Sequence, residues 1–234
     1  MKTRKTNHTN PMLDSRAPKL FADQLVFRGM HPWASSGPAT KNILSMPGRD
    51  WIWERHFSVT FHHLRVNFYG VEQNLSTWKA MSAKAQILST INKKQKFLPS
   101  ASCMTLAAYL KSTDQKFDMI NLDWMSSWSP SHHDQVLSIL NRKLIRKGGL
   151  LHIMYSMDRD KKSAWEPLSE YSSDILGLGF REMNGGKSDP RFFGIPGLIL
   201  DEVRQRGINA KITFSATFSS QVPASTISSF VVRF

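Results

Sequence analysis

The chain has 234 residues, of which 41% are hydrophobic and 21% charged, and it includes seven Trp and fourteen Phe. That length suits one domain, and the composition excludes a wholly disordered chain. Thirty-one Lys and Arg against eighteen Asp and Glu give a net charge of +13. We therefore expect a polyanionic partner, nucleic acid above all, although a basic composition also serves solubility or a place in a larger assembly.

No run approaches the roughly 18–20 apolar residues that span a bilayer, and the first ten residues lack the apolar core of a secretory signal. The expectation is a protein that is neither secreted nor membrane-bound. A single cysteine, Cys103, excludes an intramolecular disulfide and a cysteine-rich zinc site, which favours a reducing, cytoplasmic compartment. The pairs His62–His63 and His132–His133 predict no metal site, since adjacent histidines on a helix point apart.

The first 40 residues differ in composition from the rest. Residues 1–20 carry five Lys or Arg against one acid, together with two prolines, which predicts a flexible basic arm. Residues 21–40 mix apolar side chains with Gly, Pro and Ser, which predicts an irregular lead-in. The ordered domain is expected over 41–234.

From residue 41 onward, short apolar runs alternate with amphipathic stretches, the pattern of successive β–α–β units and a mainly parallel sheet. The expected strands are 42–46, 65–72, a weak 96–102 interrupted by Pro99, 117–124 and 150–157. The expected helices are 50–64 with Asp50 at its start, 74–94, 104–112, 131–147 ending at Gly148–Gly149, 162–178, and, after a loop over 184–197, 198–207. A final alternating pair, 209–218 and 225–234, predicts an antiparallel hairpin. The fold class is therefore α/β, Rossmann-like, with helices flanking the sheet.

Three places follow the ends of predicted strands, where ligands bind in an open parallel sheet. SMPGRD (45–50) follows the first strand, and its glycine allows a close approach of the backbone to a ligand. Glu72 follows the second strand, where a carboxylate can accept the hydroxyls of a ribose. Asp123 follows the fourth, beside Trp124 and Trp128. Each also has a plain structural interpretation, because Pro-Gly is common in turns and acids at strand ends are commonly solvated caps.

Taken in order, the segments KNILSMPGRDWIWERHF, VNFYGVEQN, KFDMINLDW and LIRKGGLLHI resemble the class I S-adenosylmethionine-dependent methyltransferases, from residue 41 to residue 157. The terminal hairpin matches that family's last strands. The resemblance implies S-adenosylmethionine as cofactor, with the loop after the first strand at its methionine end, the acid after the second strand on its ribose, and residues after the third strand beside its adenine. Carried over, cofactor binding falls on Met46, Pro47, Gly48, Arg49, Glu72 and Ser102, and catalysis on Asp123 and Trp124.

The sequence departs from the family at two motifs. SMPGRD replaces the usual glycine-rich loop, and the Asn/Asp-Pro-Pro-aromatic motif of the family's amino-methylating nucleic-acid enzymes keeps only its acid, Asp123. A Pro-Gly loop with a nearby acid, here Glu54, is similar to that of divergent members from phages and mobile elements. We expect Asp123 to orient or deprotonate the acceptor, Trp124 or Trp128 to stack on a planar base, and Arg49 to bind the cofactor's carboxylate.

The predicted helix over 131–147 ends in a run of basic residues: Arg142, Lys143, Arg146 and Lys147. Their spacing is helical, and we interpret them either as a solvated face or as a stripe that contacts nucleic-acid phosphates.

Two functions remain open from sequence. The first is an active methyltransferase acting on DNA, RNA or a protein bound to them. The second is a catalytically degenerate methyltransferase-like module that binds nucleic acid or serves a structural role with protein partners in a larger, viral assembly. The SMPGRD loop favours the module, whereas Glu72 and Asp123 favour the enzyme, which we prefer. A nicotinamide-dependent oxidoreductase is disfavoured because no glycine-rich fingerprint follows a strand.

Overall fold

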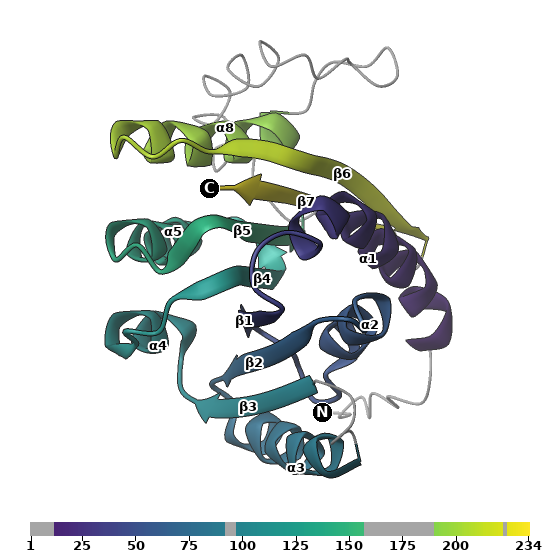
Figure 1. Cartoon of the computed structure of the whole chain (residues 1–234). Coiled ribbons are helices and arrows are strands. Elements are labelled where there is room, and N and C mark those ends of the chain that lie inside the picture. Colours follow the sequence, from purple (N-terminus) through teal and green to yellow (C-terminus); the bar gives the residue numbers. More distant parts are fainter. Residues whose placement is uncertain (1–11, 92–96, 157–189, 222–223) are drawn as a thin grey trace, which may run out of the picture.

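The computed structural model describes residues 12–91, 97–156, 190–221 and 224–234. They form a seven-stranded sheet in the order β3-β2-β1-β4-β5-β7-β6, with helices on both faces (Figure 1). The first five strands are parallel, and β7 runs antiparallel between β5 and β6. The predicted α/β class, the mainly parallel sheet and the antiparallel terminal hairpin are confirmed.

The strands have these bounds: β1 (Thr40–Ser45), β2 (Arg65–Glu72), β3 (Phe97–Cys103), β4 (Phe117–Ser127), β5 (Ile145–Ser156), β6 (Lys211–Gln221) and β7 (Ala224–Arg233). Pro99 does not interrupt β3, contrary to expectation, and lies in register with Phe68 of β2. Because β3 is at the edge of the sheet, the proline nitrogen needs no ladder partner on the outer side.

The described helices have these bounds: α1 (Met12–Ala34), α2 (Ile52–Thr60), α3 (Leu75–Ile91), α4 (Leu106–Ser112), α5 (Pro130–Asn141) and α8 (Pro190–Gln205). One buried apolar cluster lies between the sheet and α4, α5 and α8, and a second lies between the sheet and α1, α2 and α3. Figure 1 shows α4, α5 and α8 together on one side and α1 and α2 on the other. None of these helices is both long and apolar enough to cross a membrane.

The expected flexible arm and irregular lead-in are wrong for residues 12–34, because α1 runs from Met12 to Ala34. Helical spacing buries four of its apolar side chains: Val26, Phe27, Met30 and Trp33. A Cβ at Gly29 would lie 3.4 Å from the Cβ of Phe214 on β6, so the glycine lets this helix approach the sheet closely. Gly29 and Pro32, which break isolated helices, are therefore accommodated by packing.

The expected loop over 184–197 is also wrong where the structure describes it. Helix α8 begins at Pro190 and contains Pro196, and Ile195, Leu198 and Ile199 are buried against the sheet and α5. Burial of this apolar face offsets the hydrogen bond that the internal proline removes. The expected helix at 162–178 and residues 184–189 lie outside the described residues.

A continuous helix over 131–147 is wrong as well, since α5 ends at Asn141 and β5 begins at Ile145. Lys143 turns the chain between them with a φ of 50°. The β4–β5 register then shifts between Phe117 and Met119 of β4, so residues 146–149 form a bulge opposite Asp118. The glycines at 148 and 149 belong to this bulge and do not end the helix. The basic run is divided between a turn and a bulge and has no helical face.

Candidate functional site

The parallel strands end along one edge of the sheet, where their carboxyl ends meet. From β1 the chain continues outward through β2 and β3, then returns to β4 on the other side of β1. The strand order thus reverses between β1 and β4, and ligands of open parallel sheets bind at such a point. Met46–Arg49, Glu72 and Ser102 all lie at this carboxyl edge, following or ending β1, β2 and β3.

Trp51 holds the loop after β1 against β2. Its side chain is fully buried, and its Nε1 donates a hydrogen bond to the carbonyl of Met81 in α3 at 3.0 Å. A Cβ added to Gly70 of β2 would lie 2.6 Å from Trp51 Cη2 and 2.8 Å from Pro47 Cγ. Both rings therefore rest directly on the Gly70 backbone. The glycine that permits the close approach is in β2 and not in the loop itself.

Two residues of this loop have a left-handed backbone, Gly48 with a φ of 61° and Trp51 with a φ of 52°. For a bulky residue such as Trp51 this conformation costs on the order of 1–2 kcal/mol, which the buried indole offsets. Helix α2 then begins at Ile52 with no side-chain cap, so Asp50, expected at the start of this helix, does not cap it. Arg49, beside them, is exposed and accessible to a ligand.

Glu72 ends β2 with one carboxylate oxygen engaged. Its Oε1 accepts a hydrogen bond from the backbone N–H of Asn74 at 2.7 Å, and Asn74 Oδ1 in turn accepts from the N–H of Thr77 in the first turn of α3. The carboxylate is thereby oriented by the start of the helix. Among the residues that the structure describes, none hydrogen-bonds to the second oxygen, Oε2. A half-buried, oriented carboxylate with one oxygen available suits a pair of ligand hydroxyls.

The end of β3 lies beside Glu72. Glu72 is in register with Cys103, and Ser102 is in register with Val71. Because side chains alternate between the faces of a sheet, Cys103 shares the face of Glu72 and Ser102 lies on the other. Cys103 is exposed, whereas Ser102 is half-buried. Ser102 is thus at the expected edge but separated from the Glu72 side chain by the sheet.

Strand β4 extends four residues beyond Asp123, to Ser127, and does not end at an acid as expected. Asp123 is half-buried and follows Met119 and Asn121 in alternation, on the face that α1 and α2 cover. Trp124 lies on the opposite face and is 4% exposed. The two residues to which the resemblance gives a shared catalytic role therefore lie on different sides of the sheet.

Trp124 is part of the core and presents no face for stacking on a base. Its Nε1 donates to Gln135 Oε1 at 3.2 Å, and its ring stacks on His132 with centroids 4.4 Å apart and an interplanar angle of 19°. Trp128, which follows β4, is half-buried and meets Trp124 edge-on at 5.7 Å. Of the two indoles expected to stack on a base, only that of Trp128 is at the carboxyl edge with exposed surface.

His132 is a site residue that sequence reasoning missed. It lies in the first turn of α5, and its Nε2 is 3.5 Å from Ser126 Oγ at the end of β4. Burial lowers the pKa of His132, and a hydrogen bond with the backbone of Ser127 opposes that shift in part, so the ring is neutral at pH 7. The Ser129-Pro130 pair, an N-cap followed by proline at N1, is a helix-start signal that places His132 at this edge.

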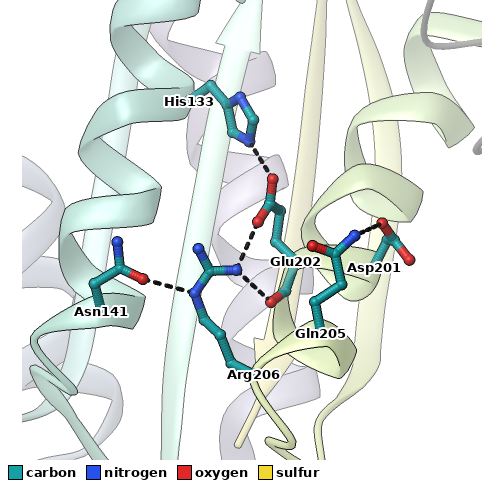
Figure 2. Close-up of polar contacts among 6 residues, drawn as sticks. All are labelled: His133, Asn141, Asp201, Glu202, Gln205 and Arg206. Carbon is teal, nitrogen blue, oxygen red and sulfur yellow. Dashed lines mark hydrogen bonds and ion pairs between the residues drawn. The ribbon is translucent and has the colours of Figure 1, made fainter.

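The neighbouring histidine, His133, belongs to a structural network between α5 and α8 (Figure 2). Its Nε2 lies 3.1 Å from Glu202 Oε1, and Arg206 Nη1 donates to Glu202 Oε2 at 2.6 Å. Arg206 Nε also donates to Asn141 Oδ1 at 2.7 Å. The two adjacent histidines do point apart, as expected. Among the described residues no group of three or more His, Cys, Asp or Glu side chains is arranged to hold a metal ion.

A buried polar chain crosses three strands on the face of Asp123. His152 of β5 lies with Nδ1 2.7 Å from Asn121 Oδ1 of β4 and Nε2 2.8 Å from Ser229 Oγ of β7. A neutral imidazole satisfies both partners, donating to the amide oxygen and accepting from the hydroxyl. The ring stacks on Trp53 of α2 at 6.3 Å, and Glu54 of the same helix is fully buried. The network fixes the strands next to β4.

No protein-family model and no curated protein sequence matches the chain. Solved structures do match it. A protein of Escherichia coli described as a methyltransferase superposes with a TM-score of 0.52 at 5% identity, covering 91% of this chain and 84% of that one. A protein of Haemophilus influenzae described as a methylase gives 0.50 at 10% identity, covering 91% and 87%. A protein of Galdieria sulphuraria described as a sarcosine dimethylglycine methyltransferase gives 0.48 at 11% identity, covering 93% and 87%.

At sequence identities this low, the superpositions demonstrate a shared fold and nothing beyond it. The chain therefore has the fold that the resemblance implied, that of the class I methyltransferases, over nearly its whole length. What it does with that fold is argued from its own residues.

Proposed function

We propose that the chain is a cytoplasmic S-adenosylmethionine-dependent methyltransferase that acts on nucleic acid, DNA or RNA, or on a substrate associated with nucleic acid. The observation that supports it most is Glu72, an oriented carboxylate with an available oxygen at the end of β2, beside the point where the strand order reverses. In the class I fold that the chain shares, the resemblance gives this position to the ribose of the cofactor.

The residues at the carboxyl edge fit such a cofactor at both of its ends. Glu72 Oε2 is available to accept ribose hydroxyls, and the exposed guanidinium of Arg49 suits the carboxylate of a methionine moiety. Met46, Pro47 and Gly48 supply the backbone between them, and Ser102, one residue before the end of β3, lies on the opposite face of the sheet from Glu72. When bound, S-adenosylmethionine supplies an electrophilic methyl group. The protein's remaining task is to position a nucleophile in line and to exclude water.

Asp123 and His132 lie on opposite faces of the sheet, and we propose them as alternative proton acceptors for the methyl-accepting substrate. Asp123 lies in β4, four residues before the carboxyl end of the strand, and we assign it the orientation or deprotonation of the acceptor. His132 is neutral at pH 7 because burial lowers its pKa, and a neutral imidazole can accept a proton. Trp128, at the mouth of the same edge, takes the stacking role, since Trp124 is buried.

The nucleic-acid part of the proposal rests on charge. A net charge of +13 creates a positive potential that attracts polyanions over the distance of a Debye length. Nucleic acid is the polyanion that also offers planar bases for Trp128 to stack on.

A catalytically degenerate module is the second candidate, and the loop after β1 is the observation that favours it. The rings of Pro47 and Trp51 occupy the space directly beside Gly70, where a glycine-rich loop would leave the backbone open to the cofactor. Under this candidate the chain binds nucleic acid or a protein assembly partner, and it descends from a divergent methyltransferase of phage or mobile-element type.

Transfer of a tritiated methyl group from S-adenosylmethionine to DNA, RNA or bulk protein separates the two candidates. We expect incorporation into nucleic acid by the wild type, loss of at least 100-fold in Asp123→Ala, and wild-type activity in the control Asp134→Ala, which changes an exposed acid of α5. No incorporation into any acceptor by a folded wild type contradicts the enzyme and supports the module.

A further inference from the structure

A second candidate site lies at the opposite, amino edge of the sheet. There, a cleft of about 720 Å³ is formed by the end of α5, the turn into β5, the segment between α8 and β6, and the end of β7. The end of β7 carries the C label in Figure 1. None of the described lining residues has an acidic side chain. Six of them are Lys or Arg: Lys143, Arg146, Lys147, Arg206, Lys211 and Arg233.

The β5 bulge brings cations to this edge. Residues 146–149 leave the regular ladder opposite Asp118, which displaces Arg146 and Lys147 from the sheet toward the cleft. A Cβ at Gly149 would lie 2.7 Å from Ile145 Cγ2 and 2.8 Å from two backbone oxygens, so the bulge requires glycine there. Lys143 is held in the adjacent turn with a φ of 50°. The bulge interrupts the strand ladder, and a positive φ is unfavourable for lysine. Both features nevertheless place basic side chains around one cleft.

The six cations fall into two groups. Arg146 is paired with the buried carboxylate of Asp118 at 2.9 Å, and Arg206 is held by Glu202. Across the described part of the chain, the other four have no acidic partner within ion-pair distance: Lys143, Lys147, Lys211 and Arg233. Lys211 and Arg233 are neighbours in register on β6 and β7. Four unpaired cations around one concave surface repel one another, and an anionic ligand relieves that repulsion.

Arg142 of the predicted basic run is not part of this group. Its guanidinium donates to the carbonyl of Leu110 and pairs with Asp114 at 3.0 Å. It ties α5 to the end of α4, a structural role. Of the four residues predicted to bind nucleic acid, Lys143 and Lys147 therefore remain as candidates, and Lys211 and Arg233 join them from the distant hairpin.

We propose that this amino-edge cleft binds the sugar–phosphate backbone of a nucleic acid, through Lys143, Lys147, Lys211 and Arg233. Exposed lysines with mobile hydrated heads suit repeated phosphates better than one rigidly held anion. The inference goes beyond the proposed function, because it concerns the opposite edge and holds for a chain that transfers no methyl group.

The distance between the two edges of the sheet suits a polymer better than a small anion. Strand β5 runs from one edge to the other. At about 3.3 Å per residue, and without the extra residues of its bulge, it spans roughly 30 Å. At about 3.4 Å per base pair this span corresponds to roughly nine base pairs. A backbone anchored in the cleft can therefore extend to the carboxyl edge without competing with a ligand there.

Fluorescence anisotropy with labelled 20-nucleotide probes, duplex DNA and single-stranded RNA, tests the proposal as a function of salt. The test variant is K143N/K147Q/K211Q/R233Q, with Asn at 143 because it tolerates a positive φ. The control, R28Q/R55Q/K79Q/K84Q, removes the same charge from α1, α2 and α3 on the other face. We expect the slope of log affinity against log salt to fall by about 3.6 for duplex DNA and about 2.8 for single strands in the test variant.

Between 50 and 200 mM salt, a slope difference of that size means that the wild type loses about 100-fold more affinity for duplex DNA than the test variant does. The control is expected to keep the wild-type slope to within about 1. Equal slopes in the test and control variants overturn the proposal, as does displacement of the probe by inorganic phosphate at equimolar concentration. The pair K147Q/K211Q, on separate strands, gives half the change and replaces the fourfold variant if that one fails to fold.

The outcome is independent of the proposed function. Calorimetry with S-adenosylmethionine is run on the same two variants, and both are expected to match the wild type because none of the changed residues is among those proposed to contact the cofactor. A changed salt slope with no cofactor binding in any protein supports the cleft and contradicts the methyltransferase.

Discussion

Replacing Gly70 by Ala tests how the loop after β1 is held. The added Cβ would lie 2.6 Å from Trp51 Cη2 and 2.8 Å from Pro47 Cγ, closer than carbon atoms approach in folded proteins. Trp51 is fully buried and hydrogen-bonded to Met81, so its ring cannot swing aside. Overpacking of this kind costs about 1–3 kcal/mol, and breaking the indole hydrogen bond adds about 1 kcal/mol. We expect Gly70→Ala to lower the free energy of unfolding by about 2–4 kcal/mol.

Urea denaturation followed by tryptophan fluorescence measures this loss. With a slope of about 2–3 kcal/mol/M, the midpoint is expected to fall by about 1 M. The matched control is Gly207→Ala, at a φ of 65° with nothing within 4 Å of the added Cβ, where only the backbone conformation costs about 1 kcal/mol. A Gly70→Ala protein within 0.5 kcal/mol of the wild type would refute the packing of the loop on β2.

Three further predictions concern α5 and its surroundings. Arg206→Met is expected to lower the free energy of unfolding by about 1–3 kcal/mol in urea, because Glu202 loses its charged partner, and an unchanged midpoint contradicts this. Burial lowers the pKa of His132, so the unfolded chain binds the extra proton first, and stability is lost as pH falls below about 6.5. His132→Gln is expected to weaken that dependence in thermal unfolding between pH 7 and 5, and identical profiles argue against it. Trp128→Ala is expected to reduce methyl incorporation with little loss of stability, whereas Trp124→Ala destabilises by about 3–5 kcal/mol, and the reverse pattern refutes the assignment.

The parallel strands and the terminal hairpin were predictable from sequence, because burial on both faces leaves continuous apolar runs such as that of β4. Strand ends were less predictable. Asp123 has the character of a strand-end acid, yet β4 continues to Ser127 because its register with β5 extends to Ser156. Pairing between distant segments decided that boundary, and local sequence does not record it.

Helices were misjudged where tertiary packing overrides local propensity. Gly29 and Pro32 suggested an irregular lead-in, but α1 is fixed by its buried face and by Phe214, almost two hundred residues away in the chain. Likewise, nothing in the sequence indicates that Lys143 has a positive φ. This backbone conformation ends the helix before the basic run. At the candidate site, Glu72 and the loop after β1 were placed correctly at one edge, whereas the burial of Trp124 and the position of His132 required the structure.

The central claim is that the carboxyl edge binds S-adenosylmethionine through Glu72, and a calorimetric titration tests it most directly. We predict saturable binding by the wild type. Glu72→Ala is expected to lower the affinity roughly 10- to 100-fold, because it removes a charged hydrogen-bond acceptor worth about 1.5–3 kcal/mol. The control Gln73→Ala, which changes the exposed neighbouring residue, is expected to keep the wild-type affinity. Absence of binding at millimolar cofactor, or equal affinity of Glu72→Ala and the wild type, would contradict the claim.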